Sequence, residues 1–136
     1  MKKQIVSLYI TVLLTALISL SSCWSQVPVF VSESKSFFSD FEVRNEKVAI
    51  RCEITLQNTF GSEYKVKLKA HFPDDVGKLL RQETLIAMDD NGDEAVFIIP
   101  AYSEKTFEVL FVGDFAGTNE KHDRRLPELE VILVSE

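Results

Sequence analysis

The side chains that carry most enzymatic chemistry are sparse in this sequence of 136 residues. It has two histidines, His71 in a run of alternating polar and apolar residues and His122 in a polar segment. It contains neither a Gly-x-Ser-x-Gly elbow nor a glycine-rich phosphate loop. The adjacent acids at 74–75 and 89–90 lie in turn-like sequences, where neighbouring side chains point apart and rarely form an acid–base couple. The sequence therefore predicts a non-catalytic protein, with a metal-dependent enzyme as a distant alternative.

The acidic segment 89–94 invites a calcium interpretation, because hard cations prefer clustered oxygen ligands. An EF-hand loop with Gly92 in its sixth place would begin at Ala87, which has no oxygen ligand in its side chain. The pair Asn91-Gly92 is instead typical of a tight hairpin turn. We therefore predict no metal and no other cofactor.

A basic stripe accompanies the acidic composition. Three lysines at alternate positions between residues 65 and 69, together with one arginine at position 51, make up this stripe. Such a group of cations suits anionic lipid headgroups or a phosphate-rich polymer. The alternative is a solvated sheet face on which Glu53 opposes one of these lysines across a hairpin. The stripe residues are Arg51, Lys65, Lys67 and Lys69.

The polar segment 113–125 is the best candidate for a binding surface. Loops of this length without their own secondary structure are usually functional or disordered, and in a sandwich the end loops commonly bind ligands. The alternative is that Phe115 fills the end of the fold while the arginines pair with Asp74, Asp75 or Asp114. The candidate residues are Phe115, Lys121, His122, Arg124 and Arg125.

Two runs of strict alternation must position these side chains. Residues 48–57 place apolar side chains at even positions, and residues 64–72 do the same after the loop 58–62. Alternation with a period of two indicates strands with one dry and one wet face, and the short loop predicts an antiparallel hairpin. A lone hairpin is marginally stable, so its dry face must pack on a second layer.

Further short extended segments supply that layer. Turn residues separate them, the segment 78–82 fits either a helical turn or a strand, and no longer helical run is present. The sequence therefore predicts an all-β fold, a two-sheet antiparallel immunoglobulin-like sandwich of seven or eight strands after an N-terminal signal segment. The additional extended segments are 27–31, 37–43, 84–88, 95–99, 106–112 and 129–134.

The N-terminus has the layout of a secretory signal: a basic start at 1–3, an apolar run over 5–20, then small residues. The sequence Leu20-Ser21-Ser22-Cys23 resembles the lipobox of bacterial lipoproteins. The resemblance implies that Cys23 is lipidated and becomes the mature N-terminus, anchored by acyl chains. The alternatives are ordinary cleavage near Ser25, which would give a secreted or periplasmic soluble protein, and an uncleaved helix.

The second cysteine has a different role. Cys52 lies between Ile50 and Ile54 on the dry face of its strand, where a free cysteine behaves as a small buried hydrophobe. This interpretation is favoured over a disulfide between Cys52 and Cys23.

The strand spacing from Val48 onward and the segment from Ile99 to Phe107 resemble the small telokin-like immunoglobulin domains of bacterial lipoproteins. In those domains a Val/Ile-Pro-Ala-Gly-Glu turn precedes a strand of the form apolar-x-apolar-x-Phe. Here Tyr102 and Ser103 stand in place of the Gly and the Glu. The Cys…Trp…Cys core of antibody domains is absent, because Trp24 lies before the domain.

The net charge is −6, and it becomes −8 once Lys2 and Lys3 leave with the leader. This acidity disfavours nucleic acid as a partner. We expect a signal peptide at 1–22, a lipid anchor and tether at 23–36 and the sandwich at 37–136. We expect export to the cell membrane or outer membrane and binding of an envelope protein or polymer; the alternative is a structural spacer or assembly subunit that pairs through a strand edge.

Overall fold

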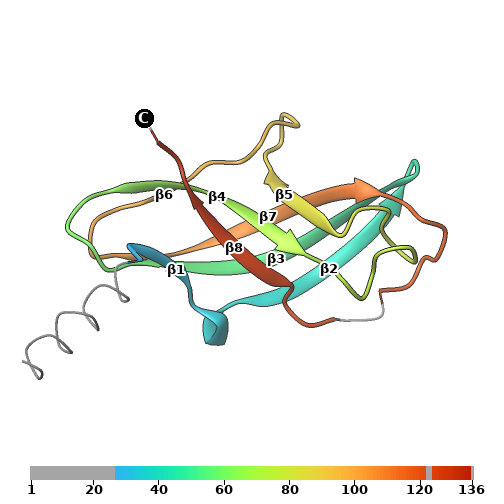
Figure 1. Ribbon diagram of the computed structural model, residues 1–136, viewed down its shortest axis with the longest axis horizontal. Coiled ribbons are helices and arrows are strands. Elements are labelled where there is room, and N and C mark those ends of the chain that lie inside the picture. Colours follow the sequence, from blue (N-terminus) through green and yellow to red (C-terminus); the bar gives the residue numbers. More distant parts are fainter. Residues whose placement is uncertain (1–26, 122–123, 136) are drawn as a thin grey trace, which may run out of the picture.

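The computed structural model describes residues 27–121 and 124–135. The described chain contains antiparallel strands and one short 3-10 helix, η1 (Glu33–Lys35), as Figure 1 shows. The strands are β1 (Val29–Val31), β2 (Phe37–Arg44), β3 (Lys47–Asn58), β4 (Tyr64–His71), β5 (Thr84–Met88), β6 (Phe97–Ile99), β7 (Glu104–Asp114) and β8 (Glu128–Leu133).

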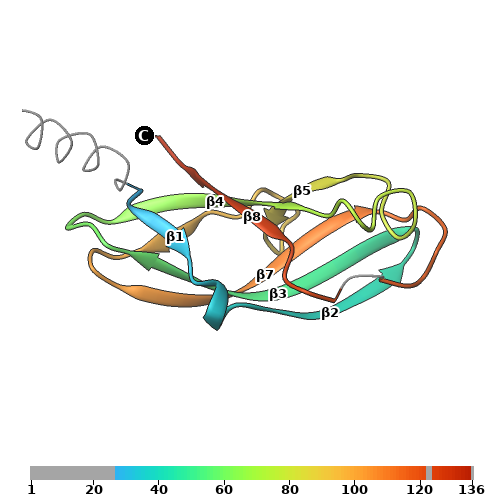
Figure 2. The ribbon, with the colours of Figure 1, turned by 60° about the horizontal axis from the view of Figure 1, so that its bottom comes forward.

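The strands form two layers, which Figure 2 shows nearly edge-on. In the first layer β3 pairs with β7 on one side and, in succession, with β2 and β1 on the other. In the second layer β4 lies between β8 and the strands β5 and β6. β5 begins beside β4 and ends beside β7, so it joins the layers into one hydrogen-bonded sheet of eight strands. The predicted all-β sandwich is confirmed.

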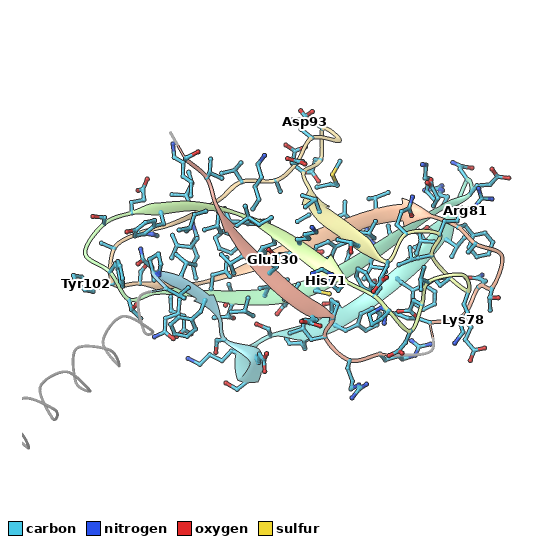
Figure 3. The ribbon with its side chains drawn as sticks, viewed as in Figure 1. His71, Lys78, Arg81, Asp93, Tyr102 and Glu130 are labelled. Carbon is cyan, nitrogen blue, oxygen red and sulfur yellow. The ribbon has the colours of Figure 1, made fainter. Side chains whose placement is uncertain are left out.

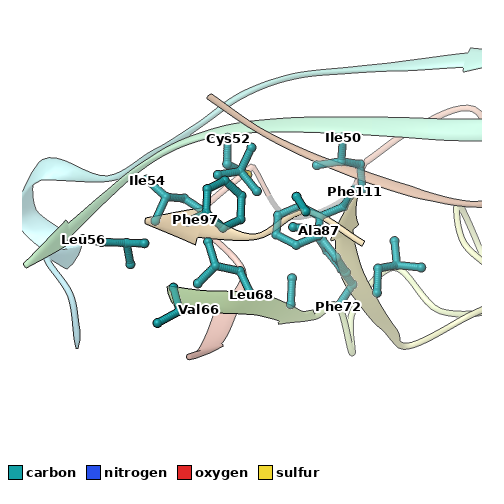
Figure 4. Packing of buried hydrophobic residues seen from close by; sticks show 14 of the residues in the cluster. Ile50, Cys52, Ile54, Leu56, Val66, Leu68, Phe72, Ala87, Phe97 and Phe111 are labelled. Atoms are coloured by element: carbon teal, nitrogen blue, oxygen red, sulfur yellow. The ribbon is translucent and has the colours of Figure 1, made fainter. Parts of the chain in front are cut away.

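The two predicted alternating runs form the facing walls of the core (Figure 4). Apart from the partly buried Tyr64, their inward side chains are buried, because period-two spacing places every second side chain on the same side of a strand. Phe111 of β7 packs edge-to-face on Phe72, and Phe97 of β6 packs in the same way on Phe107. The walls consist of Val48, Ile50, Cys52, Ile54 and Leu56 on β3 and Val66, Leu68 and Ala70 on β4.

The hairpin predicted between these runs is wrong. β3 and β4 lie in different layers, and Glu53 of β3 stands opposite Glu108 of β7 rather than opposite a lysine of β4. Stacking the two dry faces against each other buries both at once, whereas a hairpin would place them side by side with neither covered. The buried Asn58 side chain stabilises the crossing loop: its amide donates to the carbonyl oxygens of Ser62 at 2.8 Å and Ile99 at 3.1 Å.

A tight turn joins β2 to β3 as a hairpin, whereas the acidic turn 89–94 is not followed by a strand that pairs with β5. Asn45 and Glu46 both have positive φ, 52° and 62°, so β2 and β3 are joined by a two-residue primed turn. In the acidic turn, Gly92 has φ 83° and the Asp89 carboxylate accepts two backbone N–H groups. After this turn the chain returns beside β5 only briefly, and β6 then pairs with β4.

The predicted domain boundary at residue 37 lies too late. β1 pairs with β3, and Val29 is fully buried in the core. The sandwich therefore includes β1 and η1, and this shortens the expected tether. The segment 78–82 is neither a helix nor a strand; Leu79 and Leu80 are fully buried within it.

Candidate binding site

A buried ion pair holds the segment after β7 against the sandwich. Lys121 Nζ lies 3.1 Å from Asp75 Oδ2, and both side chains are 2% exposed. The ammonium also lies over the rings of Phe38, at 4.9 Å, and Phe72, at 5.9 Å. The expectation that Lys121 belongs to an exposed binding surface is therefore wrong. Its aliphatic stem packs among apolar groups while its charge is met by a carboxylate and two aromatic faces.

The turn that follows β4 positions Asp75. The Asp75 backbone oxygen accepts hydrogen bonds from the N–H groups of Lys78, Leu79 and Leu80 at 3.0–3.2 Å. These bonds fix the turn and direct the carboxylate inward, toward Lys121. The second carboxylate oxygen, Oδ1, has no hydrogen-bond partner among the described residues.

A shallow depression of about 270 Å³ lies at this ion pair. Small-molecule sites are usually larger, about 300–1,000 Å³. The depression therefore fits one side chain or one sugar unit better than a whole cofactor, and its walls carry both signs of charge. Beside the ion pair and Phe72 it is lined by His71, Pro73, Asp74, Arg125, Leu126, Pro127 and Glu128.

The predicted loop residues divide into a buried and an exposed group. Phe115 packs partly buried against the core, and its N–H donates to the Glu46 oxygen at 2.9 Å, as expected if it fills the end of the fold. Arg124 and Arg125 are exposed, and the Arg124 guanidinium lies 5.6 Å from the Phe41 ring centre. His122 lies outside the described residues.

Two of the three aspartates expected to pair with these arginines, Asp75 and Asp114, have other partners. Asp75 pairs with Lys121, and Asp114 accepts hydrogen bonds from Lys47 and, at 2.5 Å, from Gln82. The hydrogen bond from Lys47, followed by that from Gln82, lowers the pKa of the exposed Asp114 carboxyl below its usual value. The loop is thus held at both Asp114 and Lys121.

The predicted basic stripe is wrong as a single surface, because its members lie on different layers. Arg51 is on β3, where it lies 3.9 Å from Asp40 and 4.0 Å from Glu108. Lys65, Lys67 and Lys69 share the outer face of β4, where Lys67 pairs with Glu94 at 2.6 Å. Because β3 and β4 lie in different layers, Arg51 is not beside the lysines of β4, as it would be in a hairpin.

The outer face of the second layer brings together one arrangement that the sequence did not predict. His71 Nδ1 lies 3.2 Å from Thr84 Oγ1, and His71 Nε2 lies 3.6 Å from Glu130 Oε2. Figure 3 labels His71 and Glu130 on their neighbouring strands. The order hydroxyl, imidazole, carboxylate resembles a nucleophile with its base. The three residues stand on neighbouring strands of a pleated sheet, whose N–H groups lie in the sheet plane and do not converge on a reacting atom above it. The arrangement therefore lacks the oxyanion donors of acyl transfer.

Cys52 is confirmed as a buried free thiol. Burial raises the pKa of the thiol to about 11, and the charge of Lys121 acts in the opposite direction. The thiol is therefore protonated at neutral pH and unsuited to nucleophilic or redox chemistry.

Within 27–121 and 124–135, no three His, Cys, Asp or Glu residues are grouped so as to hold a metal ion. In the same ranges, no helix has the length and apolar character needed to cross a membrane. Comparison with known proteins gives no match to a family model, a curated sequence or a solved structure.

Proposed function

We propose that this chain is an exported, lipid-anchored, non-catalytic domain that binds another envelope protein or an envelope polymer. The leader and the lipobox-like sequence ending at Cys23 support the export and the anchor. The positive φ of Tyr102, 50°, supports the telokin-like resemblance, because the family turn has at this position a glycine, which adopts positive φ without strain.

The observation that carries the binding proposal is the buried ion pair beneath an exposed basic rim. Lys121 holds the long connection between β7 and β8 on the sandwich. Arg124 and Arg125 are both exposed, and Arg125 lines the depression. A loop held in this way loses little further conformational entropy when a partner binds. Guanidinium groups also suit the carboxylates of a protein or the anionic groups of a polymer.

A pull-down from solubilised envelopes tests this surface. We expect the double change Arg124→Ala and Arg125→Ala to reduce partner recovery, whereas Lys78→Ala, an exposed cation in the neighbouring loop, leaves it unchanged. Phe115 is left intact because it packs against the core. Equal recovery with all three proteins would place binding elsewhere.

Membrane fractionation tests the anchor. We expect the wild-type chain in the membrane fraction and Cys23→Ser in the soluble fraction, because acyl chains supply most of the membrane affinity. Retention of Cys23→Ser in the membrane fraction would contradict lipidation.

A second candidate function is assembly through a strand edge, favoured by the exposed side of β8. The Val134 N–H donates to the Lys65 oxygen at 2.9 Å, so alternate residues of β8 face β4. The N–H groups of Leu129, Val131 and Leu133 then point to the open side, where the described residues offer no strand partner. Concentration-dependent dimerisation that Val131→Pro abolishes would favour this function; a monomer at all concentrations would reject it.

A further inference from the structure

We infer that one end of the sandwich, the β1 tip, rests on the lipid bilayer; this inference builds on the proposed anchor at Cys23. We define the β1 tip as residues 27–28, 58–63 and 100–103. These segments lie together: the Thr59 N–H donates to the Pro28 oxygen at 3.0 Å, and the Tyr102 N–H donates to the Phe60 oxygen at 2.9 Å.

The described chain begins at this end. β1 and Tyr102 lie at the same end of the molecule, and Lys78 and Arg81 lie at the opposite end (Figures 1 and 3). Three residues lie between Cys23 and Val27, so the chain makes four steps between them. An extended chain spans at most roughly 3.6 Å per step, so Val27 lies within about 14 Å of an anchored Cys23. The headgroup region is itself about 5–8 Å deep on each side of a bilayer. An anchored chain therefore holds the β1 tip at or near the headgroups.

The surface of the β1 tip matches this position. Tyr102 is 78% exposed and Val27 is 61% exposed, although both are large apolar residues. Phe60 lies beside them and packs edge-to-face on Tyr64, with ring centres 6.2 Å apart. Tyrosine is enriched at membrane interfaces, because its ring enters the apolar boundary while its hydroxyl stays hydrated.

The distribution of charge favours the β1 tip over the opposite end. Glu63 is the one charged residue in the sequence of the tip segments. The opposite end carries Lys78 and Arg81 (Figure 3), and also Asp114, whose backbone oxygen accepts a hydrogen bond from the Arg81 N–H at 3.0 Å. Charged side chains keep their hydration and are costly to move toward an apolar boundary. The buried Asn58 amide donates to the Pro100 oxygen at 3.1 Å and so holds the turn that exposes Tyr102.

Fluorescence in the full-length lipidated chain tests the orientation. Trp24 is the single tryptophan of the sequence, so Trp24→Phe gives a background into which Tyr102→Trp or the control Lys78→Trp is placed. Each protein is reconstituted into phosphatidylcholine–phosphatidylglycerol vesicles with plain or brominated acyl chains. We expect brominated lipid to quench the Tyr102→Trp emission, together with a shift to shorter wavelength, and to leave Lys78→Trp unchanged.

The outcomes separate the orientation from the anchor. Vesicle-bound protein with no quenching at Tyr102→Trp, or with quenching only at Lys78→Trp, overturns the docking of the β1 tip while the anchor stands. Protein that does not float with vesicles, in parallel with soluble behaviour of the wild-type chain in cells, overturns the anchor itself.

Discussion

The buried pair between Lys121 and Asp75 makes a sharp prediction about stability. Lys121→Met removes the ammonium but keeps a side chain of similar length, so the change leaves the Asp75 carboxylate without its partner in a site that is 2% exposed. Two unit charges 3.1 Å apart attract by about 5 kcal/mol at an effective dielectric constant of 20, but by about 1 kcal/mol in water. Removal of one partner of a buried pair costs about 3–5 kcal/mol, because the other charge stays buried.

Urea unfolding at pH 7 measures this loss. We expect Lys121→Met to lower the free energy of unfolding by about 3–5 kcal/mol with an unchanged m-value. Such a loss is a large part of the 5–15 kcal/mol that is typical of a domain. Lys78→Met, which removes an exposed lysine from the adjoining turn, is the matched control and should change stability by less than about 0.5 kcal/mol.

The double variant Lys121→Met with Asp75→Leu completes the test. Apolar replacement of a whole buried pair is often neutral or stabilising, so we expect the double variant to recover most of the loss. A Lys121→Met protein as stable as Lys78→Met would refute the reasoning, because the pair would then have to be hydrated. A double variant no better than the single one would also refute it.

Further predictions concern three other positions in the sandwich. Asn58→Ala removes a side chain that donates to three backbone oxygens, and it should lower the free energy of unfolding by about 2–4 kcal/mol. Asn58→Asp should lower it by at least as much, because the carboxylate would face those three oxygens. Burial raises the pKa of Cys52 from 9.0 to about 11. The protonated thiol therefore stabilises the folded state fully below pH 9, and this stabilisation is lost as the pH rises to about 11. The pH-dependent loss of stability should be absent in Cys52→Ala. Native Cys52 should also resist thiol reagents until urea is added. Gly92→Ala places a Cβ at φ 83° and should lower the melting temperature, consistent with a cost of about 1 kcal/mol.

The alternation of apolar and polar residues was sufficient to predict the main strands and the buried side chains. β3 and β4 bury the side chains at the positions that the period of two assigns to the dry face, Cys52 among them. Local turn chemistry was also informative at Asn91-Gly92, where the chain turns with Gly92 at φ 83°. These features depend on neighbours within a few residues, so the sequence reports them directly.

The choice of partner strand was not predictable in the same way. Every antiparallel ladder uses the same backbone groups, so the pattern of β3 is equally compatible with β4 or β7 as its neighbour. Which neighbour forms depends on how many dry faces are covered at once, and this is a property of the whole sandwich. The error at this step also produced the basic stripe across Arg51 and Lys65, which the two layers separate.

The candidate site shows the same division. The sequence alone determined the export-like leader, the strand pattern and the position of a long polar connection that contains Arg124 and Arg125. The tertiary structure decided that Lys121 is buried beside Asp75, 46 positions earlier in the chain, and that His71 meets Thr84 and Glu130. A lysine is usually exposed, and it becomes buried only where the fold supplies a carboxylate and aromatic faces from distant segments.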